Sequence, residues 1–136
     1  MSEELITISE DVPKNYDLWK GTWNSSVEPD LEHIIMIFLP KNGNGKGKLI
    51  LGNKNEDHVF YIRINIKNIN EKSLSNIIIN GYSTGFSDIS LKLFGDDQKL
   101  QGIYELYNDA GTVSLNKSSD RKVEYLQRKP SWCWIF

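Results

Sequence analysis

Few side chains in this sequence have the types and spacing that catalysis or metal binding requires. His33 and His58 each begin an expected strand beside an acid, a setting typical of a surface histidine in a turn. Together with the single cysteine, Cys133, they lack the ligand spacing of a zinc site. No combination of nucleophile, acid and base can be placed. The sequence therefore predicts a protein that is not an enzyme and that has no catalytic residues, metal ligands or cofactor.

Three aspartates and one glycine-rich segment fall where turns are expected. Asp96, Asp97 and Asp109 suit tight turns, because an aspartate side chain accepts hydrogen bonds from nearby backbone N–H groups. The EF-hand pattern with its closing glutamate is missing. Residues 42–48 lack the Gly-Lys-Ser/Thr ending of a phosphate loop and precede a strand rather than a helix. Turns are predicted at these positions, and calcium and phosphate sites are not.

Composition and charge narrow the class of partners. The 136 residues carry a net charge of -2, and the basic residues are scattered among acids, so nucleic-acid binding is not expected. No stretch approaches the roughly 20 apolar residues of a membrane span. The N-terminal segment lacks the basic and apolar regions of a secretory signal. With one cysteine, the chain fits a reducing compartment, and we expect a cytoplasmic protein.

Alternating apolar positions predict strands through most of the chain. Between Leu91 and Leu115 the alternation is interrupted twice by compact turns, which indicates a β-meander. The segment 33–39 is apolar on both faces and should be covered on both sides, by the core, by the N-terminal arm or by a partner. No segment has a sustained helical period. Eight or nine strands with short turns predict an all-β, antiparallel, up-and-down barrel.

Three parts of the chain follow from this pattern. Residues 1–17 form an N-terminal arm, residues 18–129 the barrel domain, and residues 130–136 an apolar, tryptophan-rich tail. We expect the arm to cover one end of the barrel.

The segment 18–23 resembles the first strand of the calycins, the superfamily of lipocalins, fatty-acid-binding proteins and avidins. Their Gly-x-Trp element is matched by Gly21, Thr22 and Trp23. A Leu-x-Gly-x-Tyr pattern common in later strands of such barrels is matched at residues 100–104. The resemblance implies a lipocalin-like barrel over most of the chain.

The resemblance also implies a structural role for the motif's tryptophan. In lipocalins it closes the base of the barrel and packs against an arginine near the last strand. Trp23 and Arg128 could fill these roles, with Arg121 as the competing arginine. A second lipocalin motif around Asp88 and a full set of biotin-contacting residues are not found, so the resemblance names no ligand.

The inward face of such a barrel can be filled by side chains or can hold one small ligand. The large side chains that we assign to this face are Met36, Phe38, Phe60, Ile62, Ile64, Leu91, Leu93, Tyr104 and Leu106. We expect a non-enzymatic protein that binds a small apolar or amphipathic ligand inside the barrel by burying apolar surface. Tyr104 or Arg63 would orient the ligand, depending on the strand register.

The C-terminal tail supports an alternative function. Trp132, Trp134 and Phe136 would make an adhesive patch if exposed, so they should pack against the barrel, a second copy or another protein. Tryptophan is enriched at binding hot spots. The alternative is a protein-interaction or inhibitor module with a filled barrel. An open lumen favours the ligand carrier, and a filled lumen favours the alternative.

Overall fold

The computed structural model describes residues 5–27, 30, 32–53, 59–69, 75–83, 86–106 and 109–128. Within them the chain forms ten strands joined by turns. These strands are β1 (Leu5–Asp11), β2 (Tyr16–Ser25), β3 (Glu32–Pro40), β4 (Gly45–Asn53), β5 (Val59–Asn68), β6 (Asn76–Ser83), β7 (Phe86–Gly95), β8 (Lys99–Leu106), β9 (Asp109–Ser118) and β10 (Lys122–Arg128). In this part of the chain no helix is long and apolar enough to cross a membrane.

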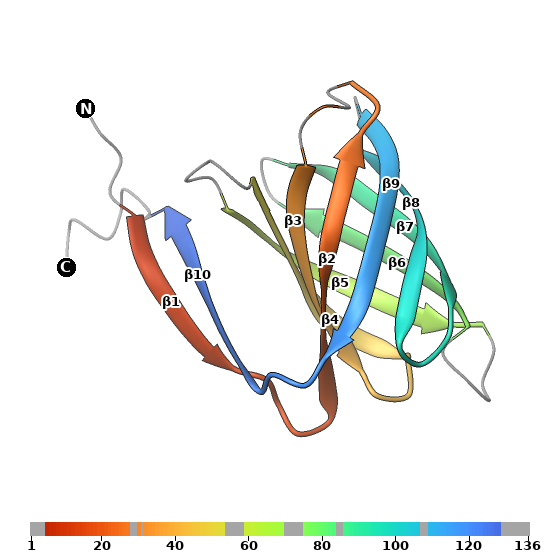
Figure 1. The fold of residues 1–136 in the computed structure, drawn as a ribbon, viewed down its shortest axis with the longest axis horizontal. Helices are drawn as coiled ribbons and strands as arrows, with labels where there is room; N and C mark the ends of the chain where they lie inside the picture. The colour runs from red at the N-terminus through yellow and green to blue at the C-terminus, as the bar shows by residue number, and fades with distance from the viewer. Residues whose placement is uncertain are drawn as a thin grey trace.

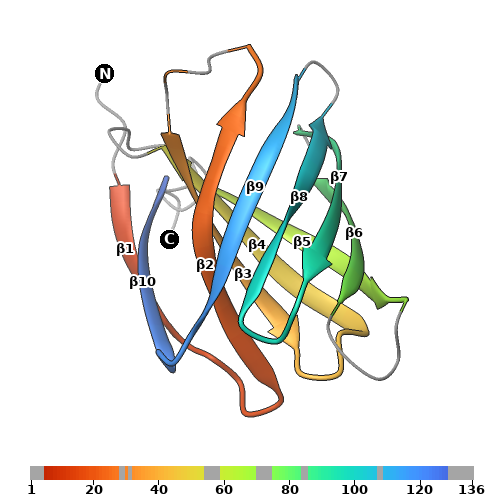
Figure 2. The same ribbon diagram turned by 45° about the vertical axis from the view of Figure 1, so that its right-hand side comes forward.

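Strands β2 to β9 form a closed antiparallel barrel in which each strand pairs with the next one along the chain (Figures 1 and 2). The pairing of β2 with β9, from Leu18 opposite Ser118 to Ser25 opposite Gly111, closes the barrel. This is the up-and-down topology that the alternating sequence pattern predicts. The fold prediction is therefore confirmed, with eight strands in the barrel.

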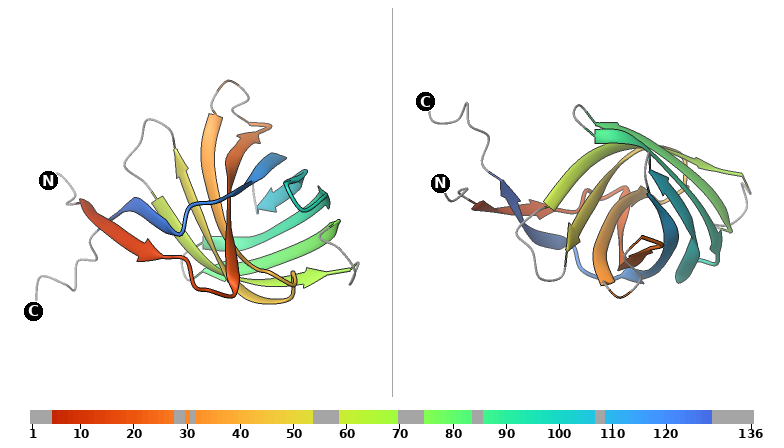
Figure 3. Two further views of the ribbon diagram at one scale, coloured as in Figure 1. Left: turned by 60° about the horizontal axis from the view of Figure 1, so that its bottom comes forward. Right: turned by 90° about the horizontal axis from the view of Figure 1, so that it is seen from above.

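The remaining two strands form a separate ribbon beside the barrel. Strand β1 pairs antiparallel with β10, from Leu5 opposite Arg128 to Asp11 opposite Lys122. Figure 3 shows this ribbon lying to one side of the barrel. Residues 122–128 therefore form a strand as expected, but the strand lies outside the barrel. Its partner strand, β1, is part of the expected N-terminal arm. In β1, Ile6 and Ile8 alternate with exposed Thr7 and Ser9, which is the pattern of a strand with one covered face.

The lumen of the barrel holds the main hydrophobic core. Trp19 on β2 is fully buried there, and β3 contributes Ile35, Ile37 and Leu39. The other buried members are Leu49, Leu51, Ile64, Ile66, Ile77, Ile79, Ile89, Leu91, Leu93, Leu100, Tyr104, Val113 and Leu115. Every barrel strand contributes buried residues to this cluster, as expected for side chains that alternate across a strand.

A second hydrophobic cluster lies outside the barrel, between its wall and the ribbon. Leu18, Phe38 and Ile50 on the wall pack with Val123 and Tyr125 on the ribbon. The cluster also contains Val12 and, partly buried, Ile8, Tyr16 and Met36. Strand β3 is therefore covered on both faces at Met36 and Phe38, as its sequence predicts, whereas Ile34 on the same outer face is exposed.

The prediction that Met36 and Phe38 face the lumen is wrong. Both side chains belong to the outer cluster, whereas Ile35, Ile37 and Leu39 point inward. The physical reason is that β3 is apolar on both faces, so hydrophobicity alone does not distinguish its inner face from its outer one.

The β2–β9 pairing should be sensitive to a side chain at Gly21. A Cβ atom there would collide with the carbonyl oxygen of Ser114 on β9. We expect Gly21→Ala to lower the free energy of unfolding by about 2 to 3 kcal/mol, because backbone atoms cannot move aside without strain. Chemical denaturation measures the change. Thr22→Ala, one residue along, should cost less than about 1 kcal/mol; equal losses in both variants would contradict the prediction.

Candidate functional site

The lumen leaves little room for a ligand in the part that the structure describes. The cavity there measures about 10 Å³, roughly enough for one water molecule. It is lined by Trp23, Ile35, Leu51, Ile89, Leu91, Tyr104, Leu106 and Val113. The described part of the lumen is therefore a packed core around this small void.

The predicted ligand-cavity residues divide into three groups. Leu91, Tyr104 and Leu106 meet at the small void, and Ile64 and Leu93 are buried elsewhere in the lumen. The side chains of Phe60 and Ile62 lie outside the described residues. Met36 and Phe38 face outward, into the cluster beneath the ribbon. Arg63 is exposed on the outer face of β5, so of the two residues expected to orient a ligand in the lumen only Tyr104 faces it.

An aromatic and polar cluster occupies one end of the lumen. Trp23 stacks on His33, with ring centroids 4.1 Å apart, and meets Tyr104 edge to face at 5.1 Å. The Tyr104 hydroxyl donates a hydrogen bond to the Asp109 carboxylate at 2.9 Å, and the Ser25 hydroxyl donates one to the same carboxylate at 2.5 Å. These contacts tie β2, β8 and β9 together. They also differ from the sequence-based expectation, because His33 is buried rather than on the surface.

The Tyr104 phenol in this cluster is held in its protonated form. Burial raises the pKa of the Tyr104 phenol above its ordinary value of 10.0, and the hydrogen bond to Asp109 acts in the same direction. The phenol therefore holds its proton. The indole N–H of Trp23 is buried and has no hydrogen-bond acceptor among the described residues. The arrangement joins β2, β3, β8 and β9 at this end of the lumen.

Of the two arginines that the calycin resemblance suggests, Arg121 lies far from Trp23. The side chain of Arg128 lies outside the described residues. Arg121 binds near the start of β2, at Tyr16, whereas Trp23 is seven residues further along this strand. At about 3.3 Å per residue, the two lie toward opposite ends of the barrel.

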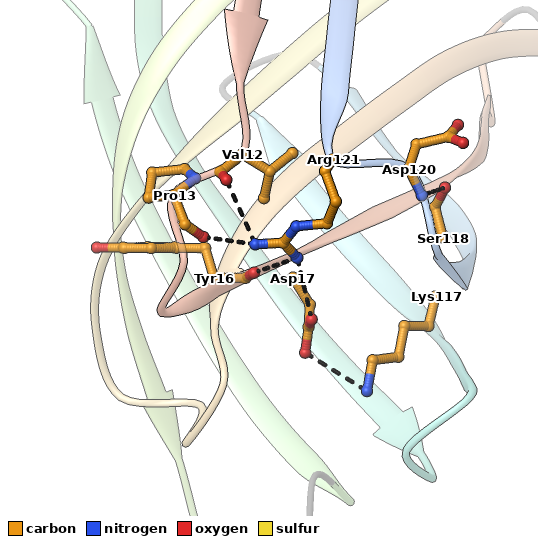
Figure 4. Close-up of polar contacts among 8 residues, drawn as sticks. All are labelled: Val12, Pro13, Tyr16, Asp17, Lys117, Ser118, Asp120 and Arg121. Atoms are coloured by element: carbon orange, nitrogen blue, oxygen red, sulfur yellow. Dashed lines mark hydrogen bonds and ion pairs between the residues drawn. The ribbon is translucent and has the colours of Figure 1, made fainter.

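Arg121 instead holds the ribbon to the barrel (Figure 4). Its guanidinium group donates hydrogen bonds to the backbone carbonyls of Tyr16 at 2.9 Å, Pro13 at 2.8 Å and Val12 at 3.3 Å. The Asp17 carboxylate lies 3.7 Å from the guanidinium and 3.4 Å from the Lys117 ammonium. One arginine thus satisfies three carbonyls in the β1–β2 connection and fixes where this connection leaves the barrel.

A larger cavity lies on the outside of the barrel, and we call it the wall groove. It measures about 620 Å³, which is in the usual range for small-molecule sites. It is lined by Pro13, Tyr16, Phe38, Lys46, Gly47, Lys48, Arg63, Ile64 and Asn65. The groove therefore runs over β3, β4 and β5 and is bounded by the β1–β2 connection that Arg121 holds.

The groove combines an aromatic surface with cationic side chains. The Tyr16 hydroxyl donates a hydrogen bond to the Lys46 carbonyl at 2.7 Å, which fixes the tyrosine at the groove's edge. The Lys48 ammonium lies 5.7 Å from the centre of the Phe38 ring and 3.1 Å from the Glu10 carboxylate on β1. Lys46 and Arg63 are exposed beside them. This arrangement can hold a molecule that has both apolar surface and negative charge.

Sequence reasoning did not find the wall groove. Lys46 and Lys48 are two residues apart, as are Arg63 and Asn65, so the sequence does show that each pair shares one face of its strand. That the two pairs face the same groove depends on the register of β4 against β5 and on the path of the β1–β2 connection. Neither can be read from one sequence.

Comparisons with known proteins give no name to this site. No protein-family model matches the chain, and no curated protein or solved structure matches it either. The closed eight-stranded barrel is consistent with a calycin but is not specific to that superfamily. Among the described residues no group of three or more His, Cys, Asp or Glu side chains could hold a metal ion. Trp132, Trp134 and Phe136 lie outside the described residues.

The raised pKa of Tyr104 makes stability depend on alkaline pH. Above pH 10 the unfolded chain releases this proton while the folded protein retains it, so stability is present below pH 10 and falls as the pH rises. We expect Tyr104→Phe to make this fall shallower, while costing about 1 kcal/mol at pH 7 through the lost hydrogen bond. Urea unfolding between pH 7 and 11 measures both effects. An unchanged slope in Tyr104→Phe would contradict the prediction.

Removing the Arg121 contacts should loosen the ribbon selectively. We expect Arg121→Gln to lower the opening free energy of β1 and β10 amides by about 1 to 2 kcal/mol, because a charge-assisted set of hydrogen bonds is lost. Native-state hydrogen exchange resolves this, with the amides of β6 and β7 unchanged. Lys122→Gln, an exposed neighbour, is the matched control. Faster exchange spread evenly over the barrel would contradict a role confined to the ribbon.

Proposed function

We propose that this protein is a non-enzymatic binding protein that takes a small amphipathic ligand in the wall groove. The observation that carries the proposal is the contrast between the two cavities. The described part of the lumen retains about 10 Å³, whereas the groove offers about 620 Å³. A ligand in the lumen would have to displace packed core side chains, whose contacts stabilise the fold.

The groove supplies the two components that small-molecule sites usually combine. Tyr16 and Pro13 offer apolar surface, and burying such surface contributes roughly 25 cal/mol per Å². Asn65 and the cationic side chains supply directional polar contacts around it. The site is also anchored on paired strands and on the Arg121 contacts, which limits the entropy lost on binding.

The packing of the described part of the lumen also supports the alternative function, a protein-interaction or inhibitor module. The packed lumen fits a barrel that acts through its surface. The tryptophan-rich tail through which it would act lies outside the described residues. Contact through Trp132, Trp134 and Phe136, with a protein partner or a second copy, therefore stays a prediction, as does membership of the calycins.

Filling the groove tests the proposal directly. Asn65 lies on the groove, and Asn80 lies directly opposite it on β6 but outside the groove. Both are exposed, so tryptophan at either position should leave the core intact. We expect Asn65→Trp to weaken binding of 1-decanol and related amphiphiles at least about tenfold, because the new side chain occupies the apolar surface. Asn80→Trp should bind as the wild type does.

Two measurements locate the ligand. Calorimetric titration gives the affinity of each variant, and nuclear magnetic resonance shifts show which residues the ligand contacts. Shifts concentrated at residues 46–48 and 63–65 support the proposal. Shifts concentrated at Ile89, Leu91 and Val113 would place the ligand in the lumen and overturn it, as would equal binding by both tryptophan variants.

A further inference from the structure

We infer that the ligand of the wall groove carries an oxyanion headgroup, either a carboxylate or a sulfate or phosphate ester, on an apolar tail. This inference rests on the proposed function and adds the charge of the ligand to it. It also assigns the residues that recognise the charge, Arg63 and Lys46. Three features of the outer barrel wall support it.

The first feature is the register of β4 against β5. Lys48 stands directly opposite Arg63, and Lys46 stands opposite Asn65. Like charges placed directly opposite each other on an antiparallel pair destabilise the sheet. Lys46 is diagonal to Arg63, at a separation that long side chains can span. The wall thus gathers three cations on one face of two neighbouring strands.

The second feature is the unequal supply of counter-charges. Glu10 on β1 binds the Lys48 ammonium through both carboxylate oxygens, at 3.1 and 3.2 Å. Arg63 and Lys46 make no ion pair with any other described residue. The excess positive charge also runs against the net charge of the whole chain, which is -2. Two cations therefore remain available to a ligand in the groove.

The third feature is the apolar surface beside these cations. Pro13 is exposed and Tyr16 half-buried along the edge of the groove, whereas Phe38, under Lys48, is buried. An arginine can bind both oxygens of a carboxylate or ester headgroup through its planar fork. With the headgroup between Arg63 and Lys46, an alkyl or aromatic tail would lie against Tyr16 and Pro13. The site thus matches an amphipathic anion better than a neutral or cationic amphiphile.

Matched ten-carbon ligands test the inference on the full chain. Decanoate, decyl sulfate and 1-decanol have the same tail but differ in headgroup, and all are titrated calorimetrically below their aggregation limits. We expect both anions to bind at least about tenfold more tightly than the alcohol, because each gains charge-assisted hydrogen bonds. Raising the salt concentration should weaken the anions and leave the alcohol unchanged. Decanoate and decyl sulfate compared with each other distinguish a carboxylate from an ester headgroup.

Single substitutions assign the recognising side chains. Arg63→Gln and Lys46→Gln should each weaken decanoate about five- to tenfold and leave 1-decanol unchanged. Lys67→Gln is the matched control, because Lys67 is exposed on the same face of β5 but does not line the groove. It should bind decanoate as the wild type does.

The outcomes separate this inference from the function on which it rests. If 1-decanol binds as tightly as decanoate, and Asn65→Trp weakens both, the groove is the site but the charge assignment is wrong. The charge assignment is also wrong if Lys67→Gln weakens decanoate as much as Arg63→Gln does. If none of the three ligands binds, or if Asn65→Trp has no effect on them, the proposed function fails and the inference fails with it.

Discussion

The closing pair of strands, β2 with β9, is the constraint on which the rest of the structure depends. The start of β2 and the end of β9 lie side by side, since Leu18 stands opposite Ser118. The chain therefore enters and leaves the barrel at one end and at one point on its wall. Strands β1 and β10 emerge as neighbours, and antiparallel pairing satisfies their backbone groups. Arg121 then fixes the direction of this ribbon through the carbonyls of Val12, Pro13 and Tyr16.

The ribbon determines which residues the barrel wall beneath it carries. A two-stranded ribbon is marginal in water by itself, so it packs its apolar face on β2, β3 and β4. The covered wall carries Leu18, Phe38 and Ile50 in place of polar residues. Where this cover ends, over β4 and β5, the wall groove begins, with Phe38 at the boundary. The groove thus arises from the same packing that stabilises the ribbon.

The sequence predicts the strands better than it predicts their faces and partners. On β7, Leu91 and Leu93 alternate with Ser90 and Lys92, so their inward direction can be read directly. On β3, Met36 and Phe38 are as apolar as their neighbours, and only the ribbon reveals which face is outer. The sequence of β10 alternates as that of a barrel strand does. This strand lies outside the barrel because β9 pairs with β2 and closes it. The groove is harder still, because Lys48 and Arg63 become neighbours only through the register of β4 and β5.

The two faces of this barrel wall obey different physical limits, and this difference favours a site on the outside. In the described part of the lumen, Trp19 and the branched side chains around it leave about 10 Å³, so enlarging this space for a ligand would remove core contacts. Outside, the aligned charges of Lys48 and Arg63 cost little folding energy, because Arg63 remains in water. A filled barrel can therefore acquire a binding surface without weakening its core, provided that a fixed element such as the β1–β2 connection gives that surface a concave shape.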